Sequence, residues 1–292
     1  MKLRQYLKSP ANHALSLIVV VSLLSGCTSS TKPTYPKEKL TAAIQDVCKN
    51  EYKIDVKATL AGSTLYVYVP LEDLFIKADK PLKYTDKFSI EDNTVSFENN
   101  TLQARYFIKT IADQEKTQEV KFNENCIRTI NNVWKVLRRV LFSMGCSVKD
   151  EPKFLYIIAA DIKNGVKSEE LTYYLDLKKV SYDFISWGEY QHRSIQNIAV
   201  APEIIEDKEG KNISYKDITA KEFIASQIQQ RIKLKFQKPE VEKNADIDKE
   251  ISKIISTTIK IYDFKDFSQA DLYNLVNNAR TILNRKAILE DY

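Results

Sequence analysis

The feature that most constrains the fold is a change of hydrophobic period near residue 53. Between residues 38 and 51, apolar side chains recur three or four positions apart, as on one face of a helix. From residue 54 to residue 69 they alternate with polar side chains, and Ala61-Gly62-Ser63 interrupts the alternation as a turn would. The pattern therefore predicts a helix followed by a β-hairpin, which indicates the α+β class.

A second pattern of this kind lies in the middle of the chain. A long apolar stripe predicts a helix over 123–144, with Gly145 as the residue after its end. The apolar run 154–160 then predicts a buried strand, Asn164-Gly165 a turn, and 170–178 a partner strand. Helix-then-hairpin thus occurs twice, at 38–69 and 125–178, as in a structural repeat.

The remaining elements are predicted with less regular patterns. The expectations are a hairpin turning at 91–94, a strand at 101–111, a helix opened by a capping box at 219–222 that passes into a strand at 232–236, a helix from 247, a short strand at 259–261, and a final helix capped at 268–271 and running to 283. The charged segment 238–248 contains Pro239 and is predicted to be a subdomain joint. Residues 38–292 should therefore form one globular α+β region of short amphipathic helices on mostly antiparallel sheet.

The first 26 residues have the organisation of a secretory signal peptide. Lys2, Arg4 and Lys8 form a basic start, and the run 14–24 is apolar except for two serines. As a helix, this run would rise about 16 Å, well short of a bilayer core of about 30 Å. A cysteine ends the segment in the sequence Leu24-Ser25-Gly26-Cys27.

This four-residue sequence resembles the lipobox of bacterial lipoproteins. The resemblance implies cleavage between Gly26 and Cys27 and attachment of diacylglycerol to the Cys27 thiol. Two or three acyl chains hold a protein firmly on a bilayer. Residues 27–37 contain two prolines and no apolar face, so they are expected to be a flexible tether, in which ten residues reach about 35 Å at most. The resemblance predicts a cell-envelope location. In some enterobacteria, an Asp directly after the cysteine retains a lipoprotein in the inner membrane. Thr28 at this position therefore favours the outer membrane, where the organism has one.

Composition excludes several classes of function. Three of the 44 basic residues lie in the signal segment and the chain has 39 acidic residues, so the mature chain is almost neutral and nucleic-acid binding is not expected. His192 is the only histidine after Cys27, and the glycines are far apart. Zinc sites of the histidine type and phosphate-cradling loops are therefore not expected, and we predict no cofactor or metal.

Three cysteines remain besides Cys27. Cys126 and Cys146 flank the long predicted helix, and its length of about 30 Å is incompatible with a disulfide between them. Cys48 could pair with either, and buried free thiols are the alternative.

The most chemically varied stretch is Trp187-Gly-Glu-Tyr-Gln-His-Arg193. It could line a ligand groove, with Trp187 and Tyr190 stacking and with polar contacts from Glu189, His192 and Arg193. The alternative is an exposed loop or edge strand in which Glu189 and Arg193 pair.

Three hypotheses for function follow. The leading one is a membrane-anchored, non-catalytic envelope lipoprotein that contacts the bilayer through acylated Cys27 and contributes a surface for other envelope proteins. The second is a lipoprotein that binds a small molecule or glycan through 187–193, and the third is an enzyme that depends on carboxylates. Two close carboxylates with raised pKa in a pocket would favour the enzyme, an aromatic groove the ligand binder, and a broad apolar patch the interaction protein.

Overall fold

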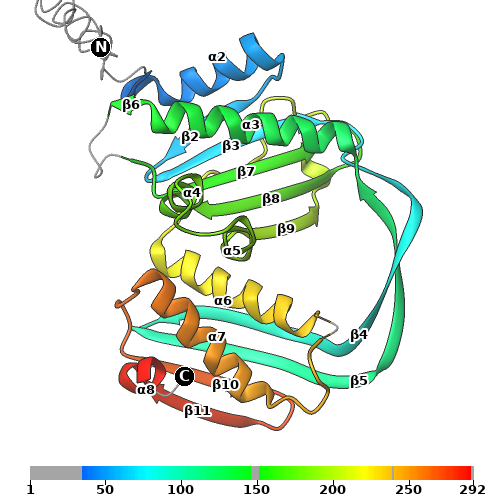
Figure 1. The fold of residues 1–292 in the computed structure, drawn as a ribbon, viewed down its shortest axis with the longest axis vertical. Helices are drawn as coiled ribbons and strands as arrows, with labels where there is room; N and C mark the ends of the chain where they lie inside the picture. The colour runs from blue at the N-terminus through cyan, green and yellow to red at the C-terminus, as the bar shows by residue number, and fades with distance from the viewer. Residues whose placement is uncertain (1–34, 146–150, 239, 291–292) are drawn as a thin grey trace, which may run out of the picture.

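The protein has the expected α+β fold, in which helices cover and separate two mostly antiparallel sheets (Figure 1). The computed structural model describes residues 35–145, 151–238 and 240–290. In the described part of the chain, the first sheet has the order β2-β3-β7-β8-β9, with only the β3–β7 pair parallel. Its strands are β2 (Lys57–Ala61), β3 (Thr64–Leu71), β7 (Phe154–Asp161), β8 (Val166–Tyr173) and β9 (Ile195–Val200).

Helices α2 (Leu40–Tyr52) and α3 (Glu124–Phe142) pack on one face of this sheet. Their apolar stripes meet the strand residues that point the same way, such as Val67 and Ile157. The two predicted helix-then-hairpin units are confirmed as α2-β2-β3 and α3-β7-β8. The first strand of the first unit lies at the sheet edge, whereas the first strand of the second is central. The two units therefore share an order of elements but not a position in the sheet.

A long β-ribbon joins this sheet to the rest of the molecule (Figure 1). It consists of β4 (Phe75–Glu98) and β5 (Thr101–Phe122). The strand predicted at 101–111 is confirmed, but the turn predicted at 91–94 is wrong because β4 runs through it. The chain reverses instead at Asn99 and Asn100, whose φ values of 46° and 60° give the left-handed conformations that a tight hairpin needs.

The tip of the ribbon is part of the second sheet, in the order β11-β10-β5-β4. Strands β10 (Gln269–Asn274) and β11 (Ala279–Asn284) replace the helix predicted over 268–283, which is wrong. Burial in β10 alternates through Ala270, Leu272 and Asn274 as it does in a strand with one covered face. The short helix α8 (Arg285–Glu290) follows.

Helix α6 (Ala220–Phe236) lies between the two sheets, and helix α7 (Ile247–Tyr262) packs beside it over the second sheet (Figure 1). The predicted capping box is confirmed, because Thr219 and Glu222 hydrogen bond to each other's backbone amides. The strands predicted at 232–236 and 259–261 are wrong, since each helix continues through these residues. The joint predicted near 238–248 covers most of the segment between these helices and the first residues of α7. Its role as a domain boundary stays a prediction.

Smaller elements complete the fold. They are β1 (Tyr35–Pro36), the 3₁₀ turn η2 (Lys37–Lys39), β6 (Met144–Gly145), α4 (Tyr174–Ser181), α5 (Trp187–Arg193) and the 3₁₀ turn η4 (Pro202–Ile204). Helix α3 ends at Phe142, so Gly145 is not its C-terminal cap as predicted but pairs with β1. The strand predicted at 170–178 ends at Tyr173 and gives way to α4.

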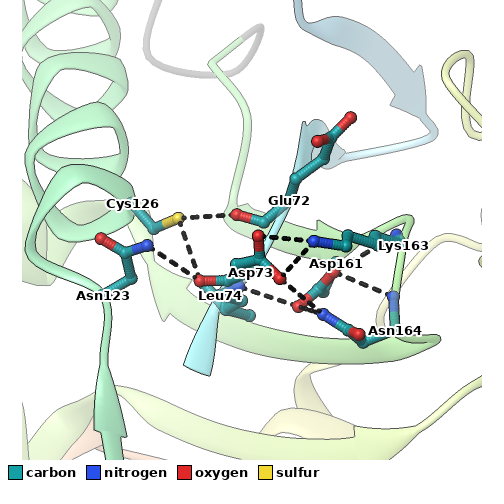
Figure 2. A network of polar contacts seen from close by, with 8 residues as sticks. All are labelled: Glu72, Asp73, Leu74, Asn123, Cys126, Asp161, Lys163 and Asn164. Atoms are coloured by element: carbon teal, nitrogen blue, oxygen red, sulfur yellow. Dashed lines mark hydrogen bonds and ion pairs between the residues drawn. The ribbon is translucent and has the colours of Figure 1, made fainter. Parts of the chain in front are cut away.

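The root of the ribbon is fixed to the first sheet by a polar network around Asp161 (Figure 2). The Asp161 carboxylate accepts hydrogen bonds from the backbone amides of Leu74, Lys163 and Asn164 and from the Asn164 side chain. On the other strand of the ribbon, the Asn123 side chain donates to the Asp73 carbonyl at 3.1 Å. The network therefore holds both the start of β4 and the end of β5 against the end of β7.

The cysteines of the described segments are free. Cys48 and Cys126 are both buried, and neither forms a disulfide, which excludes a Cys48–Cys126 bond. Burial raises the pKa of the Cys48 thiol to about 11. Cys146 lies outside the described residues, as do the signal segment, the lipobox and the tether up to residue 34. Within the described ranges, no helix has the length and apolarity that crossing a membrane requires.

Candidate functional site

Residues 187–193 form the short helix α5, not the loop or edge strand of the alternative interpretation. The Ser186 hydroxyl caps it by accepting a hydrogen bond from the Glu189 amide at 3.1 Å. The helix places its predicted site residues on two sides. Trp187 and Tyr190 are in edge-to-face contact with ring centroids 5.5 Å apart. Glu189 and His192 instead line a separate cavity of about 290 Å³ next to α6 and α7.

Arg193, the fifth predicted residue, has a structural role. Its guanidinium forms ion pairs with Glu189 at 2.8 Å and with Asp176 at 2.9 Å. Asp176 is buried in α4, so Arg193 joins α4 to α5. The five predicted residues therefore do not form one site, and the expected Glu189–Arg193 pair is present.

The side of α5 that carries Trp187 and Tyr190 borders a cavity of about 370 Å³. This volume is within the range of small-molecule sites. Trp134 also borders it, so this residue is only half-buried in the core and lines the cavity with its other side. The lining comes from α3, β8, α4, α5 and β9: Asn131, Trp134, Lys135, Arg138, Glu170, Leu177, Trp187, Tyr190, Gln191 and Gln196.

Glu170 is the acidic group of this lining. It lies in the middle of β8, where alternation directs Leu171 toward α6 and Glu170 toward α3. Burial raises the pKa of the Glu170 carboxyl, and hydrogen bonds with Trp134 and Ser194 only partly oppose that rise. A carboxyl with raised pKa beside two indole rings and a tyrosine is a feature of binding and catalytic sites alike.

The positive charge of the lining is positioned by an aromatic ring. The Arg138 guanidinium lies over the Trp187 ring, 5.5 Å from its centroid. Such cation–π contact holds the arginine and the exposed tryptophan in a fixed relation. The cavity therefore combines preorganised aromatic surfaces with amide, guanidinium and carboxyl groups.

The raised pKa makes Glu170 a group that lowers stability near neutral pH. The folded protein holds this proton to higher pH than the unfolded chain does, so stability falls as pH rises from the ordinary value of 4.5 through the raised one. We expect Glu170→Gln to raise the melting temperature at neutral pH and to remove this fall. The gain in the free energy of unfolding should be about 1.4 kcal/mol for each unit by which the pKa of Glu170 is raised.

Thermal unfolding at several pH values measures this effect. The control is Glu169→Gln, because Glu169 points to the other face and pairs with Lys167 at 2.9 Å. That variant should gain no stability. A Glu170→Gln protein that is no more stable than the parent at neutral pH would contradict the assignment.

Sequence reasoning found Trp187 and Tyr190 but missed the other half of the cavity. Glu170 and Trp134 were not among the residues predicted to form a site. The signal for Glu170 was its place in a strand directly before the buried Leu171, which the sequence pattern of 166–173 shows only weakly. Arg138 and the three amides on α3, α5 and β9 carry no motif.

Other parts of the described surface are less suited to a ligand. A larger depression of about 660 Å³ lies between β2, β3 and the loop that holds Lys208, and its described lining is charged and aliphatic. Nowhere among the described residues do three or more histidine, cysteine or acidic side chains gather to hold a metal ion. Comparisons with protein-family models, with curated proteins and with solved structures found no match.

Proposed function

We propose that this protein is a lipid-anchored lipoprotein of the bacterial envelope whose folded part binds a glycan in the cavity beside α5. The observation that carries the proposal is the pairing of Trp134 and Trp187 with a partly buried carboxyl and three amide side chains around one cavity. Sugars present apolar C–H faces between hydroxyl groups. Indole rings can cover such faces, and amide, carboxyl and guanidinium groups can donate to or accept from hydroxyl groups.

Binding is favoured over catalysis because Glu170 is the only acid in the described lining of the cavity. Glycoside hydrolysis uses two carboxyl groups on either side of the scissile bond. The cation nearest the rings, Arg138, cannot take the place of the second acid. Glu170 is therefore assigned a contact with ligand hydroxyl groups, not proton transfer.

The chain supplies its own reporter for the test. Both of its tryptophans line the cavity, so a ligand that enters should change most of the tryptophan fluorescence. The mature protein would be screened on an array of immobilised glycans that includes peptidoglycan fragments, and the hits titrated by fluorescence. We expect Trp187→Ala to weaken binding at least about tenfold, or about 1.4 kcal/mol, as loss of an aromatic anchor does.

The matched control is His192→Ala. His192 lies on the same helix but lines the other cavity, so this variant should bind as the parent does. Equal loss in both variants would point to damage to α5 rather than to a contact with the ligand. An empty array, or unchanged affinity in Trp187→Ala, would refute the glycan proposal.

A second candidate function is protein assembly along the ribbon. The β4 strand forms an edge of its sheet, and the half of the ribbon nearer the first sheet carries exposed apolar side chains at Leu82, Tyr84 and Val120. Exposed strand edges of this kind accept a further strand from a partner. This candidate becomes the leading one if the glycan experiments fail.

A further inference from the structure

Three apolar side chains on α4 and directly after it are exposed to solvent. Leu175 is 44% exposed, Tyr182 is 62% exposed and Phe184 is 79% exposed. We name these three residues the apolar corner. Burying such side chains stabilises a protein by about 1.5–3 kcal/mol each. Leu175 and Tyr182 are seven positions apart, about two helical turns, so they fall on the same side of α4, and Phe184 follows two residues later. The exposure of these three side chains therefore needs an explanation of its own.

The backbone presents these side chains in a fixed geometry. The Phe184 amide donates to the Lys179 carbonyl at 2.8 Å, and the Asp183 amide donates to the Val180 carbonyl at 3.3 Å. Asp183 has a left-handed φ of 59°. These are the bonds of a Schellman motif, in which the residue at the Phe184 position usually packs back on its helix. Here Phe184 stays largely exposed.

The apolar corner lies beside the point where the chain leaves for its predicted anchor. The Tyr182 ring stacks on Phe142 with centroids 5.8 Å apart. The next residue, Ser143, accepts a hydrogen bond at its carbonyl from the Tyr35 amide at 3.3 Å. In Figure 1, α4 and β6 accordingly lie on the same side of the molecule. Tyr35 lies eight positions after Cys27, a span of about 29 Å at most.

We propose that the apolar corner inserts into the headgroup region of the membrane to which Cys27 is attached. The proposal rests on the lipid anchor of the proposed function but not on glycan binding. The tether keeps this side of the protein close to the bilayer, where Tyr and Phe side chains are stabilised at the interface. The lysines of the last turn of α4 add little to this contact, because Lys178 pairs with Glu151 at 2.6 Å and Lys179 lies 3.9 Å from Asp176. The proposal therefore rests on the apolar side chains and on the length of the tether.

This contact would also orient the candidate site. Trp187 follows Phe184 by three residues, so the cavity beside α5 would lie near the membrane surface. A glycan carried by a membrane-bound molecule would then be within its reach.

The test places a tryptophan in the apolar corner of the lipidated full-length mature protein. The protein would be reconstituted on vesicles of phosphatidylethanolamine and phosphatidylglycerol, with or without bromine on the acyl chains. Bromine quenches tryptophan only at close range. We expect Phe184→Trp to add emission that shifts to the blue on vesicles and is lost in brominated vesicles.

The matched control is Val200→Trp. Val200 is 81% exposed, and it pairs with Val166 at the opposite end of β8 from α4. Its added emission should survive in brominated vesicles. Equal quenching of the two variants, or no quenching of either, would overturn the proposal, and circular dichroism would show that both are folded. Flotation of the parent protein with vesicles separates the lipid anchor from the insertion of the apolar corner. If the parent does not float, the anchor is refuted, and the insertion that depends on it is refuted too. If the parent floats but Phe184→Trp is not selectively quenched, only the insertion is refuted.

Discussion

Replacing Asp161 with alanine is expected to lower the free energy of unfolding by about 3–5 kcal/mol, as removal of the central partner of a buried charged network does. Asp161 is only 1% exposed. Its carboxylate receives the Leu74 amide at 2.8 Å and the Asn164 amide at 3.0 Å (Figure 2). Alanine would leave these donors without an acceptor, and the root of the ribbon would lose its attachment to β7.

The effect should depend on pH in a defined direction. Burial alone would raise the pKa of Asp161, but hydrogen bonds from the Asn164 side chain and from three backbone amides bring it below the ordinary value of 3.8. A lowered folded-state pKa contributes stability that is present above the unfolded value and is lost as pH falls through the folded one. The difference between parent and Asp161→Ala should therefore shrink as pH falls below 3.8.

Urea unfolding at neutral and acidic pH measures both expectations. The control is Asp73→Asn in the same network, because the Asp73 side chain is half-exposed, pairs with Lys163 at 2.8 Å, and has a φ of 53° that asparagine tolerates. Exposed ion pairs contribute about 0–1 kcal/mol, so this variant should stay close to the parent. An Asp161→Ala protein that is as stable as Asp73→Asn would show that the network does not hold the ribbon.

The helices with a continuous apolar stripe could be predicted from sequence because one covered face is enough to define them. This holds for α2 and α3, which each bury one stripe on the same sheet. The ribbon could not be predicted in the same way. Its middle is exposed on both faces, so the alternation of apolar and polar residues is weak there. Residues 91–94 are as polar as Asn99-Asn100, so the sequence does not show which of the two segments forms the turn.

The last third of the chain shows a different source of error. In 268–283, apolar residues spaced three or four apart fit a helix, yet Ala270 and Leu272 are buried in a strand that pairs with β5. Such pairing with a strand more than a hundred residues earlier is a tertiary effect that overrides local preference. Helix α6 lies between two sheets, so apolar residues occur on more than one of its faces. At its end, in 232–236, apolar and polar residues therefore alternate as they do in a strand.

The candidate site was half predictable for a similar reason. Trp187 and Tyr190 were recognisable by residue type, and a short helix then brought them to one side. Glu170 looked like a surface residue, because a carboxyl on the covered face of a strand has the same sequence pattern as one on the solvated face. Only the packing of α3 and α5 over β8 distinguishes the two.

Replacing Cys27 with alanine is expected to abolish lipid attachment completely, because the thiol is the only atom to which the lipobox pathway can link diacylglycerol. Each buried CH₂ of an acyl chain contributes about 0.8 kcal/mol to membrane binding, so two or three chains account for nearly all of the anchoring. The variant should accumulate as the uncleaved precursor. Because the apolar signal segment would keep that precursor with the membranes, fractionation alone cannot report the loss.

Incorporation of radiolabelled palmitate, together with the size of the labelled band, is therefore the measurement. The control is Cys48→Ala, since Cys48 is buried and its pKa of about 11 keeps the thiol protonated and unreactive. That variant should take up label as the parent does. Label in Cys27→Ala, or its absence from the parent, would remove the anchor from the proposed function. The apolar corner would then lose its membrane as well, because its position matters only for a protein tethered within about 29 Å of the bilayer.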